Sequence, residues 1–449
     1  MKQIVSLALA LVLAAPALTV AQEEAGPAEQ EAAQTATALT LVSAWRSAQE
    51  NNHALQSREF LRRAEQHGVR EAWAAFLPHI DASGSYGWSR YTRDYGGQVG
   101  EVTETENPNR YDVGLSQVIY SHRAAKGVTR ARAADRLSAA ELDAFRIDIG
   151  YLAIEAYLEA ASIHAEAQIV AEQVSNEEKR LEQLSEMREH GFASRADTLE
   201  AQASLDEIRA EQISLDSKYR AALMHLQAVT GIDSQDLSLQ PVSDNSWRST
   251  LLLLERDWLE VALANSGLLQ RSRNQLQLAE ETVKLEQASH WPELHLNMRY
   301  NQNDTFSTNV LEETRAELQL RLPIYSGGAT SARVRQAKER MHAGRYELLD
   351  GENNIRSEVA RLVEELRGSY SRIQALQAAT RSAEVALDVA EQGFRGGVRS
   401  LNELLDSRTR LSRTQRNLVA EIHQNLAHQF RLQQTAGTLS ESDITKHLP

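Results

Sequence analysis

Residues 121–189 read SHRAAKGVTRARAADRLSAAELDAFRIDIGYLAIEAYLEAASIHAEAQIVAEQVSNEEKRLEQLSEMRE, with no proline and only two glycines. In the second half of this stretch, apolar residues recur at alternating steps of four and three, which is typical of a helix that packs along one narrow seam. The seam consists of Ile163, Ala167, Val170, Val174, Leu181 and Leu184. At 1.5 Å per residue such a helix is about 100 Å long, several times the diameter of an ordinary domain. The stretch therefore predicts a rod rather than a globular fold.

The sequence predicts this rod twice. Residues 327–394 have almost the same length and keep the same apolar spacing. The tripeptide Ile-Tyr-Ser stands at 119–121, and again, about 205 residues later, at 324–326. Gly191 and Gly397 are separated by a similar distance. Each half of the chain therefore has one plan, which is helix, strand pair, long helix, turn and helix, and this indicates an internal duplication.

The predicted organisation begins with a secretory signal. Lys2 precedes an apolar stretch, and Ala21 offers a cleavage site. The expected segments are a signal peptide at 1–21, a flexible leader at 22–38, a first repeat at 39–230, an inter-repeat segment at 231–250, a second repeat at 251–436 and a C-terminal tail at 437–449. Besides the rods, the expected helices cover 39–76, 196–230, 251–290 and 400–434.

Four stretches change from the helical period to strict alternation of apolar and polar residues. The expected strands cover 79–91, 111–120, 293–302 and 315–325. About ten residues with one apolar face is what a tilted strand needs to cross a bilayer, although an amphipathic sheet covering a helical core is the alternative. Four strands cannot close a barrel, and lipid does not tolerate open sheet edges, so several copies must contribute.

Composition excludes several classes of protein. The formal charge of -14 argues against nucleic-acid binding, which needs a basic surface. The absence of cysteine excludes disulfides and thiolate chemistry. The thirteen histidines show no metal-ligand spacing, and no nucleophile elbow, phosphate loop or HExxH motif is present. We therefore expect no enzyme, no cofactor and no metal site.

Three motifs resemble those of the TolC family of outer-membrane efflux channels. They are LPIYSGGATSARVRQAKER at 322–340, GFASRADTLEAQASL at 191–205 and GGVRSLNELLDSRTRL at 396–411, and the resemblance extends over about residues 39–439. It implies a mainly α fold with a small β part, built from a duplicated helix-hairpin-helix repeat. It also implies a homotrimer whose twelve-stranded barrel in the outer membrane of a Gram-negative bacterium continues into a long periplasmic helical barrel.

The resemblance also implies a function and partners. The chain would be the exit duct of a tripartite efflux pump or type I secretion system, with an iris-like periplasmic gate. A periplasmic adaptor, or membrane fusion protein, would dock on it, and an inner-membrane pump of the RND, ABC or MFS type would feed it. The alternative is a soluble periplasmic coiled-coil adaptor or scaffold, which also combines helical hairpins with a small β part but needs no bilayer-length strands.

Residue roles at the tip follow from the same resemblance. Glu403 and Asp406 match the acidic pair that rings the periplasmic aperture, where repeated carboxylates would favour cations. The alternative is that both are ordinary carboxylates favoured at a helix start by the helix dipole. Asp197 and Arg399 match positions of the latch that holds the tip closed, whereas Phe394 replaces the tyrosine of the family. The expected tip turns and adaptor contacts are Gly191, Phe192, Gly396, Gly397 and Val398.

Overall fold

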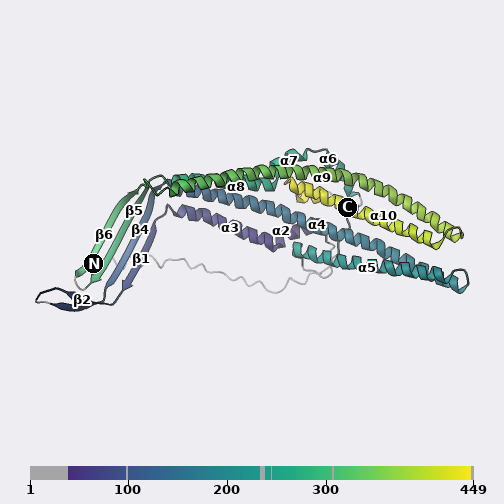
Figure 1. Ribbon diagram of the computed structural model, residues 1–449, viewed down its shortest axis with the longest axis horizontal. Coiled ribbons are helices and arrows are strands. Elements are labelled where there is room, and N and C mark those ends of the chain that lie inside the picture. The colour runs from purple at the N-terminus through teal and green to yellow at the C-terminus, as the bar shows by residue number, and fades with distance from the viewer. Residues whose placement is uncertain (1–38, 98–99, 233–237, 244, 306–307, 446–449) are drawn as a thin grey trace, which may run out of the picture. The chain divides into compact units, whose positions relative to one another are not determined.

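Two long helices dominate the structure, which is a computed structural model that describes residues 39–97, 100–232, 238–243, 245–305 and 308–445. Helix α4 (His122–Glu189) has 68 residues and helix α9 (Ala329–Arg395) has 67 (Figure 1). Both rods predicted from the apolar spacing are therefore confirmed. The predicted signal peptide and leader lie outside the described residues.

Four antiparallel strands form one sheet that joins the two repeats. The strands are β1 (His79–Tyr86), β4 (Asn109–Ser121), β5 (Glu293–Thr305) and β6 (Thr308–Arg321), in the order β1-β4-β5-β6. The first repeat supplies β1 and β4, the second supplies β5 and β6, and β4 pairs with β5 from Asn109↔Asp304 to Ser121↔Glu293. Strands β1 and β6 form the two edges of this sheet.

The sheet has one apolar and one polar face, as the alternation predicted. Because the register aligns the strands, side chains of one kind share a face. The apolar face includes the exposed side chains of Ile80, Val113, Met298, Leu318 and Leu320. On the polar face Arg299 of β5 lies 3.3 Å from Asp112 of β4.

The predicted strand bounds are wrong at the end of 79–91 and at both ends of 315–325, where the strand already begins at Thr308. The first strand stops at Tyr86. The end of the predicted strand and the residues after it instead form β2 (Ser89–Asp94), which pairs with β3 (Glu101–Glu106). Polar pairs hold this hairpin: the Tyr91 hydroxyl lies 2.8 Å from a carboxylate oxygen of Glu104. Strand β6 stops at Arg321 because Pro323 follows it closely and has no N–H to donate.

The first predicted helix, 39–76, is two helices, α2 (Leu41–Asn51) and α3 (His53–Ala74). Asn52 separates them. Its side-chain oxygen accepts the backbone N–H groups of Ala54 and Leu55, which satisfies the start of α3. Its amide donates to the Val229 carbonyl 2.9 Å away, which ties the break to the end of a neighbouring helix.

The predicted helix at 251–290 is three helices. After a short 3-10 helix, η1 (Ser246–Ser249), the structure contains α6 (Thr250–Leu254), α7 (Trp258–Asn265) and α8 (Gly267–Ala288). The Asp257 carboxylate accepts the N–H groups of Leu259 and Glu260 at the start of α7. Ser266 lies between α7 and α8 in a non-helical conformation. The apolar spacing continues across both breaks, so it did not reveal them.

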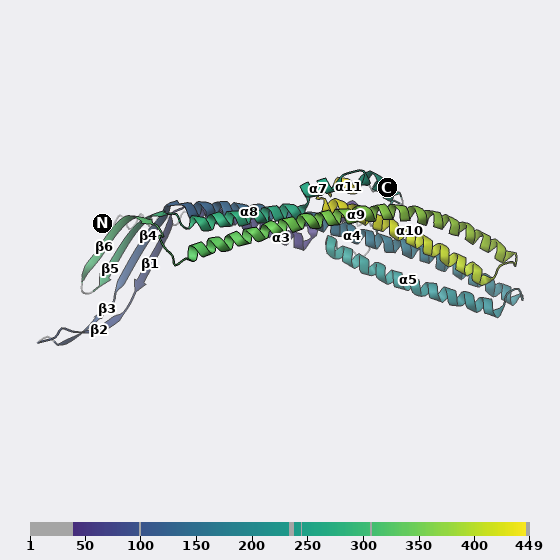
Figure 2. The ribbon, with the colours of Figure 1, turned by 45° about the horizontal axis from the view of Figure 1, so that its top comes forward.

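The remaining helices are α5 (Arg195–Thr230), α10 (Leu401–Thr435) and α11 (Glu441–Thr445). We call the turns between α4 and α5 and between α9 and α10 the tips. Near the tips the helices form a row in the order α5-α4-α10-α9. Near the sheet they form a second row in the order α3-α4-α8-α9. Figures 1 and 2 show the first row from two directions. Helices α5 and α3 therefore stand at one edge of these rows and α9 at the other. None of the described helices is long and apolar enough to cross a membrane.

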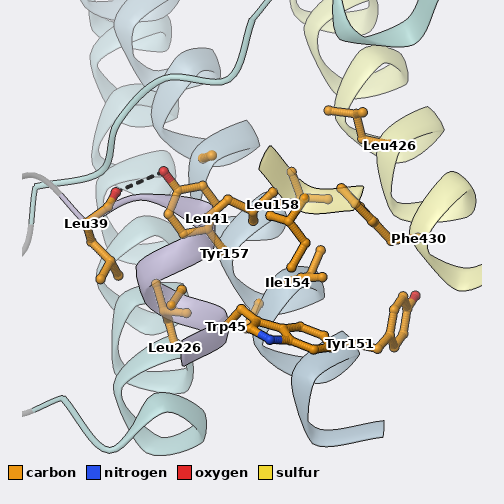
Figure 3. Packing of buried hydrophobic residues seen from close by; sticks show 14 of the residues in the cluster. Leu39, Leu41, Trp45, Tyr151, Ile154, Tyr157, Leu158, Leu226, Leu426 and Phe430 are labelled. Atoms are coloured by element: carbon orange, nitrogen blue, oxygen red, sulfur yellow. Dashed lines mark hydrogen bonds between the residues drawn. The ribbon is translucent and has the colours of Figure 1, made fainter. Parts of the chain in front are cut away.

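The largest apolar core lies where α2, α4, α5 and α10 meet (Figure 3). Tyr157 of α4 is 1% exposed, and its hydroxyl lies 3.0 Å from the Leu39 carbonyl oxygen. Trp45 of α2 lies against Gly150 of α4, where a Cβ atom would be 2.1 Å from the indole ring. The segment expected to be a tail also contributes to this core, because Ile444 of α11 is fully buried.

This contact gives a stability prediction. Gly150→Ala should destabilise the protein and loosen α2, because the new methyl group would overlap the Trp45 ring. Gly127→Ala is the matched control in the same helix: nothing lies within 4 Å of its added Cβ, so it should raise stability by about 0.5–1 kcal/mol. Thermal unfolding of the two variants, followed by circular dichroism, measures both effects. Equal transition temperatures for the two variants would contradict the prediction.

Candidate functional site

The two tips of the helical hairpins are built by the same backbone motif. Gly191 has φ 78° and Gly397 has φ 69°, values in the left-handed region that favours glycine. After each glycine the next N–H turns back to the helix: Phe192 donates to the Met187 carbonyl at 2.7 Å and Val398 donates to the Gly393 carbonyl at 2.9 Å. These hydrogen bonds satisfy carbonyl groups at the helix end. The duplicated glycines thus make duplicated turns.

The other predicted tip residues have different roles. Gly396 has φ -80°, which any residue can adopt, so the turn needs glycine only at Gly397. The side chains of Phe192 and Val398 are 79% and 84% exposed. Each tip therefore presents one apolar side chain that the described part of the chain leaves exposed.

Each tip continues into a helix that begins with a capping box. In α5, Ser194 Oγ accepts the Asp197 N–H at 3.1 Å, and the Asp197 carboxylate accepts the Ser194 N–H at 2.9 Å. In α10, Ser400 and Glu403 repeat both bonds at 3.3 and 2.9 Å. The hydrogen bonds from Ser194 hold the pKa of Asp197 below its ordinary value. Asp197 and Glu403 are therefore structural caps as well as candidate gate residues.

The predicted aperture pair lies at the start of α10. Glu403 and Asp406 are both exposed, and they are three residues apart on one side of the first turns of that helix. Glu403 has the helix-start role, because its carboxylate completes the capping box with Ser400. The aperture role depends on other copies of the chain and stays a prediction.

The predicted latch pair is not joined within one chain. Among the ion pairs of the described residues, none links Asp197 to Arg399. The Arg399 side chain is exposed and packs beside Gly393, where an added Cβ would lie 2.9 Å from its Cγ atom. A latch between Asp197 and Arg399 thus stays a prediction.

An ionic cluster that the sequence reasoning missed lies between the tip-proximal helices. Arg408 of α10 lies 3.1 Å from Glu177 of α4 and 2.9 Å from Glu391 of α9. Glu177 is only 1% exposed. Arg408 therefore connects three helices through a buried charge, an arrangement that is costly to break because it would leave Glu177 without a partner.

Phe394 contacts Arg180, another cation near this cluster. The guanidinium carbon of Arg180 lies 4.4 Å from the centre of its ring, a cation–π contact. Burial, together with the like charge of Arg408, lowers the pKa of Arg180. Position 394 therefore acts through its aromatic ring, and phenylalanine has no hydroxyl group that could form a hydrogen bond there.

The sequence contained a signal for this cluster. Glu177 stands between Val174 and Leu181, at spacings of three and four residues, so it occupies the apolar seam of α4. A charge at a seam position is buried when the helices pack, and it needs a partner. No group of three or more histidine, aspartate or glutamate side chains in the described residues is arranged to hold a metal ion.

The comparison with protein families identifies the fold. The profile described as "Outer membrane efflux protein" matches residues 44–232 and 258–438. The chain belongs to this family. The two matched segments correspond to the two repeats, one on each side of the inter-repeat region.

Two named outer-membrane and secretion proteins are similar to this chain along most of its length. The chain is 23% identical over 418 residues to the outer membrane protein TolC of Vibrio cholerae, covering 91% of this chain and 92% of the relative. It is 25% identical over 422 residues to the alkaline protease secretion protein AprF of Pseudomonas aeruginosa, with 91% and 86% covered.

Solved structures of low identity share the fold. The structure of CusC has a TM-score of 0.76 at 16% identity and covers 88% of this chain and 92% of its own. The outer membrane channel CmeC of Campylobacter jejuni has a TM-score of 0.74 at 14% identity, with 91% and 90% covered.

Family membership decides between the two functions left open by the sequence. The protein is an outer-membrane efflux or secretion duct of a Gram-negative bacterium, a transport channel rather than an enzyme. The soluble adaptor or scaffold is not favoured. The predicted family and localisation are thus confirmed.

The ionic cluster yields a prediction for the tip. Arg408→Ala should lower the free energy of unfolding by about 3 kcal/mol, because the buried Glu177 carboxylate loses its cation. Arg361→Ala is the control: Arg361 forms exposed ion pairs with Glu358 and Glu365 within α9, so its loss should cost at most about 1 kcal/mol.

Denaturant unfolding of the detergent-solubilised variants measures the difference. The double variant Glu177→Leu/Arg408→Leu should recover most of the stability, because it removes the unpaired charge together with its partner. If Arg408→Ala and Arg361→Ala were equally mild, the cluster would have no structural weight.

Proposed function

We propose that three copies of the chain close into one ring, whose strands cross the outer membrane as a twelve-stranded barrel and whose helices enclose a periplasmic tunnel. Exported material would pass along this tunnel and leave through the barrel. The observation that carries the proposal is that, in the described residues, the sheet and both helical rows each end in two edges without a partner, on the same two sides (Figure 1). A ring of copies joins one side of each chain to the other side of the next.

The sheet supports this arrangement. Its edge strands β1 and β6 come from opposite ends of the order β1-β4-β5-β6 and run in opposite directions. The β6 edge of one copy can therefore pair with the β1 edge of the next in the same antiparallel manner. Hydrocarbon offers no hydrogen-bond partner to an open edge, so a sheet with an exposed apolar face needs this closure.

The helical rows have matching edges. On α5 the exposed side chains of Leu199, Ile213 and Met224 lie opposite the residues buried against α4. On α9 Val385 and Val389 are exposed in the same way. Apolar stripes on both outer helices fit a contact between neighbouring copies, since a soluble surface would bear polar residues there.

The ring would bring the tip residues of several copies together. Helices α5 and α9 stand at opposite edges of the row, so Asp197 of one copy would approach the turn that carries Arg399 of the next. The latch would then join neighbouring copies instead of helices of one chain. The exposed Glu403 and Asp406 of three copies would surround one axis and form a negative ring that prefers cations.

The exposed side chains at the tips and the names of the relatives support a periplasmic adaptor and an inner-membrane pump as partners. We infer that a periplasmic adaptor contacts Phe192 and Val398, which each tip leaves exposed. An inner-membrane pump of the RND, ABC or MFS type would supply the exported material. The name of AprF describes protease secretion, and the family name describes efflux, so both small molecules and polypeptides remain candidate cargoes.

The lipid-facing side of the sheet can be tested with adjacent residues. Leu318→Lys should strongly reduce recovery of assembled protein in the outer-membrane fraction, because a lysine facing lipid costs about 2–4 kcal/mol near the bilayer centre. Gln319→Lys, on the polar face of the same strand, should assemble normally. Equal recovery of the two variants would refute a lipid-facing apolar side.

The aperture can be tested without disturbing the helix cap. In Glu403→Gln/Asp406→Asn, the glutamine keeps the capping box with Ser400 while both charges disappear. The reversal potential in a planar bilayer under a salt gradient should shift toward that of a non-selective pore. Glu347→Gln/Asp350→Asn removes the same two charges at the same spacing from an exposed part of α9 far along the helix, and it should leave selectivity unchanged. An unchanged reversal potential in the first variant would refute the aperture assignment.

A further inference from the structure

The first turns of both long helices carry a strong positive charge in an acidic protein. We call residues 122–136 of α4 and 329–345 of α9 the basic collar. Each range contains five arginine or lysine residues and one acidic residue, whereas the whole chain has a formal charge of -14. The positive charge is therefore concentrated in the part of each long helix that adjoins the sheet.

The two repeats share the amount of positive charge in the collar, but most of the basic residues do not stand at matched positions. Arg130 and Arg335 occupy matched places in the two repeats, but Arg132, Lys338 and Arg345 have no basic counterpart. If one specific contact were required, the positions would be expected to match. The repeated quantity is the density of positive charge, which is what a diffuse anionic surface recognises.

In the described residues, most cations in the α9 part of the collar form no ion pair. Arg335, Lys338, Arg340 and Arg345 are exposed, and none belongs to an ion pair among the described residues. Arg333 differs, because it lies 3.3 Å from Glu286 of α8. Four unpaired cations on one helix repel each other, so an external anion would stabilise them.

Exposed aromatic side chains lie at the start of the collar and beside it. Strand β4 ends at Ser121, and the next residue, His122, stacks on Trp291 at 4.8 Å between ring centres. Trp291 is 52% exposed. The Arg132 guanidinium lies 5.7 Å from the ring of Trp73, which is 48% exposed, so this cation shares a surface with an aromatic. Tryptophan and tyrosine concentrate at the membrane–water boundary, so these cations would lie just outside it.

We propose that the basic collar binds the phosphate headgroups of anionic phospholipids in the leaflet that faces the helices. This inference rests on the proposed placement of the four strands in the bilayer. A headgroup layer adds roughly 5–8 Å to each side of the hydrocarbon, which is the length of the first one or two helical turns. The remaining collar residues lie within about one or two Debye lengths of the headgroup layer, where the charge of the membrane surface still attracts cations.

A neighbouring copy is a poorer occupant for this surface. The edge opposite α9 in the sheet-proximal row is α3 (His53–Ala74), which contains four arginines and three glutamates. It therefore brings no excess of negative charge to the collar. Anionic lipid supplies that charge continuously around the whole ring.

Native mass spectrometry of the detergent-purified full chain can test the proposal. The protein is titrated with phosphatidylglycerol and with phosphatidylcholine of identical acyl chains. Wild type should retain phosphatidylglycerol at least about tenfold more strongly, because each basic side chain near the surface strengthens binding several-fold. The preference should fall as salt increases.

Two variants with the same charge change separate the collar from net charge. The collar variant is Arg335→Gln/Lys338→Gln/Arg340→Gln/Arg345→Gln. The control variant is Lys179→Gln/Lys218→Gln/Arg356→Gln/Arg381→Gln, which removes four exposed cations from other parts of the helices. The collar variant should lose most of the lipid preference, and the control should keep it.

Liposome flotation of all three proteins distinguishes failure of the inference from failure of the proposed function. If wild type did not enter the bilayer, the proposed membrane placement would be wrong. If wild type entered but bound both lipids equally, or if the collar variant kept the preference, the inference would be overturned. Binding of wild type, but not of the collar variant, to isolated cell wall, with equal retention of both lipids, would assign the collar to the wall instead.

Discussion

Unsatisfied hydrogen-bond groups at the edges of a four-stranded sheet constrain everything else in this protein. Strands β1 and β6 each offer a row of N–H and C=O groups that no other described strand pairs. Water can satisfy such groups, but hydrocarbon cannot. Strand β4 continues directly into α4, and β6 continues through a short turn into α9. In the proposed ring, pairing of the sheet edges would therefore also bring the apolar edges of the helical rows together.

At the tips, the same few atoms serve both architecture and charge. The carboxylates of Asp197 and Glu403 accept backbone N–H groups and begin their helices, and they also stand at the predicted gate. Exchange of such a carboxylate for an apolar residue would leave the serine N–H without its acceptor and would weaken the helix start. This double duty explains why a serine three residues before an acidic residue occurs at both tips, although the acid is aspartate in one and glutamate in the other.

The periodic parts of the fold were predictable from sequence, and the interruptions were not. Helix α4 begins within one residue of its predicted start, because a long uninterrupted period contains many independent observations. The breaks at Asn52 and Asp257 depend on single capping side chains, and the break at Ser266 depends on the non-helical backbone of one residue. Each effect is local and leaves the apolar spacing intact. Hairpin β2–β3 was missed because polar cross-strand pairs stabilise it, and these resemble a loop in sequence.

The candidate site was predictable only in part, for a similar reason. Motif resemblance singled out Glu403 and Asp406, whose aperture role stays a prediction. It did not reveal Arg408, which joins three helices that are far apart in sequence. The single residue Asn52 has a related, geometric importance. Since only this residue separates α2 from α3, it sets the rotational phase between them. A residue inserted into the first turn of α3 would rotate the side chains that follow it by about 100° about the helix axis, withdraw the buried Leu55 and turn a different face of α3 outward.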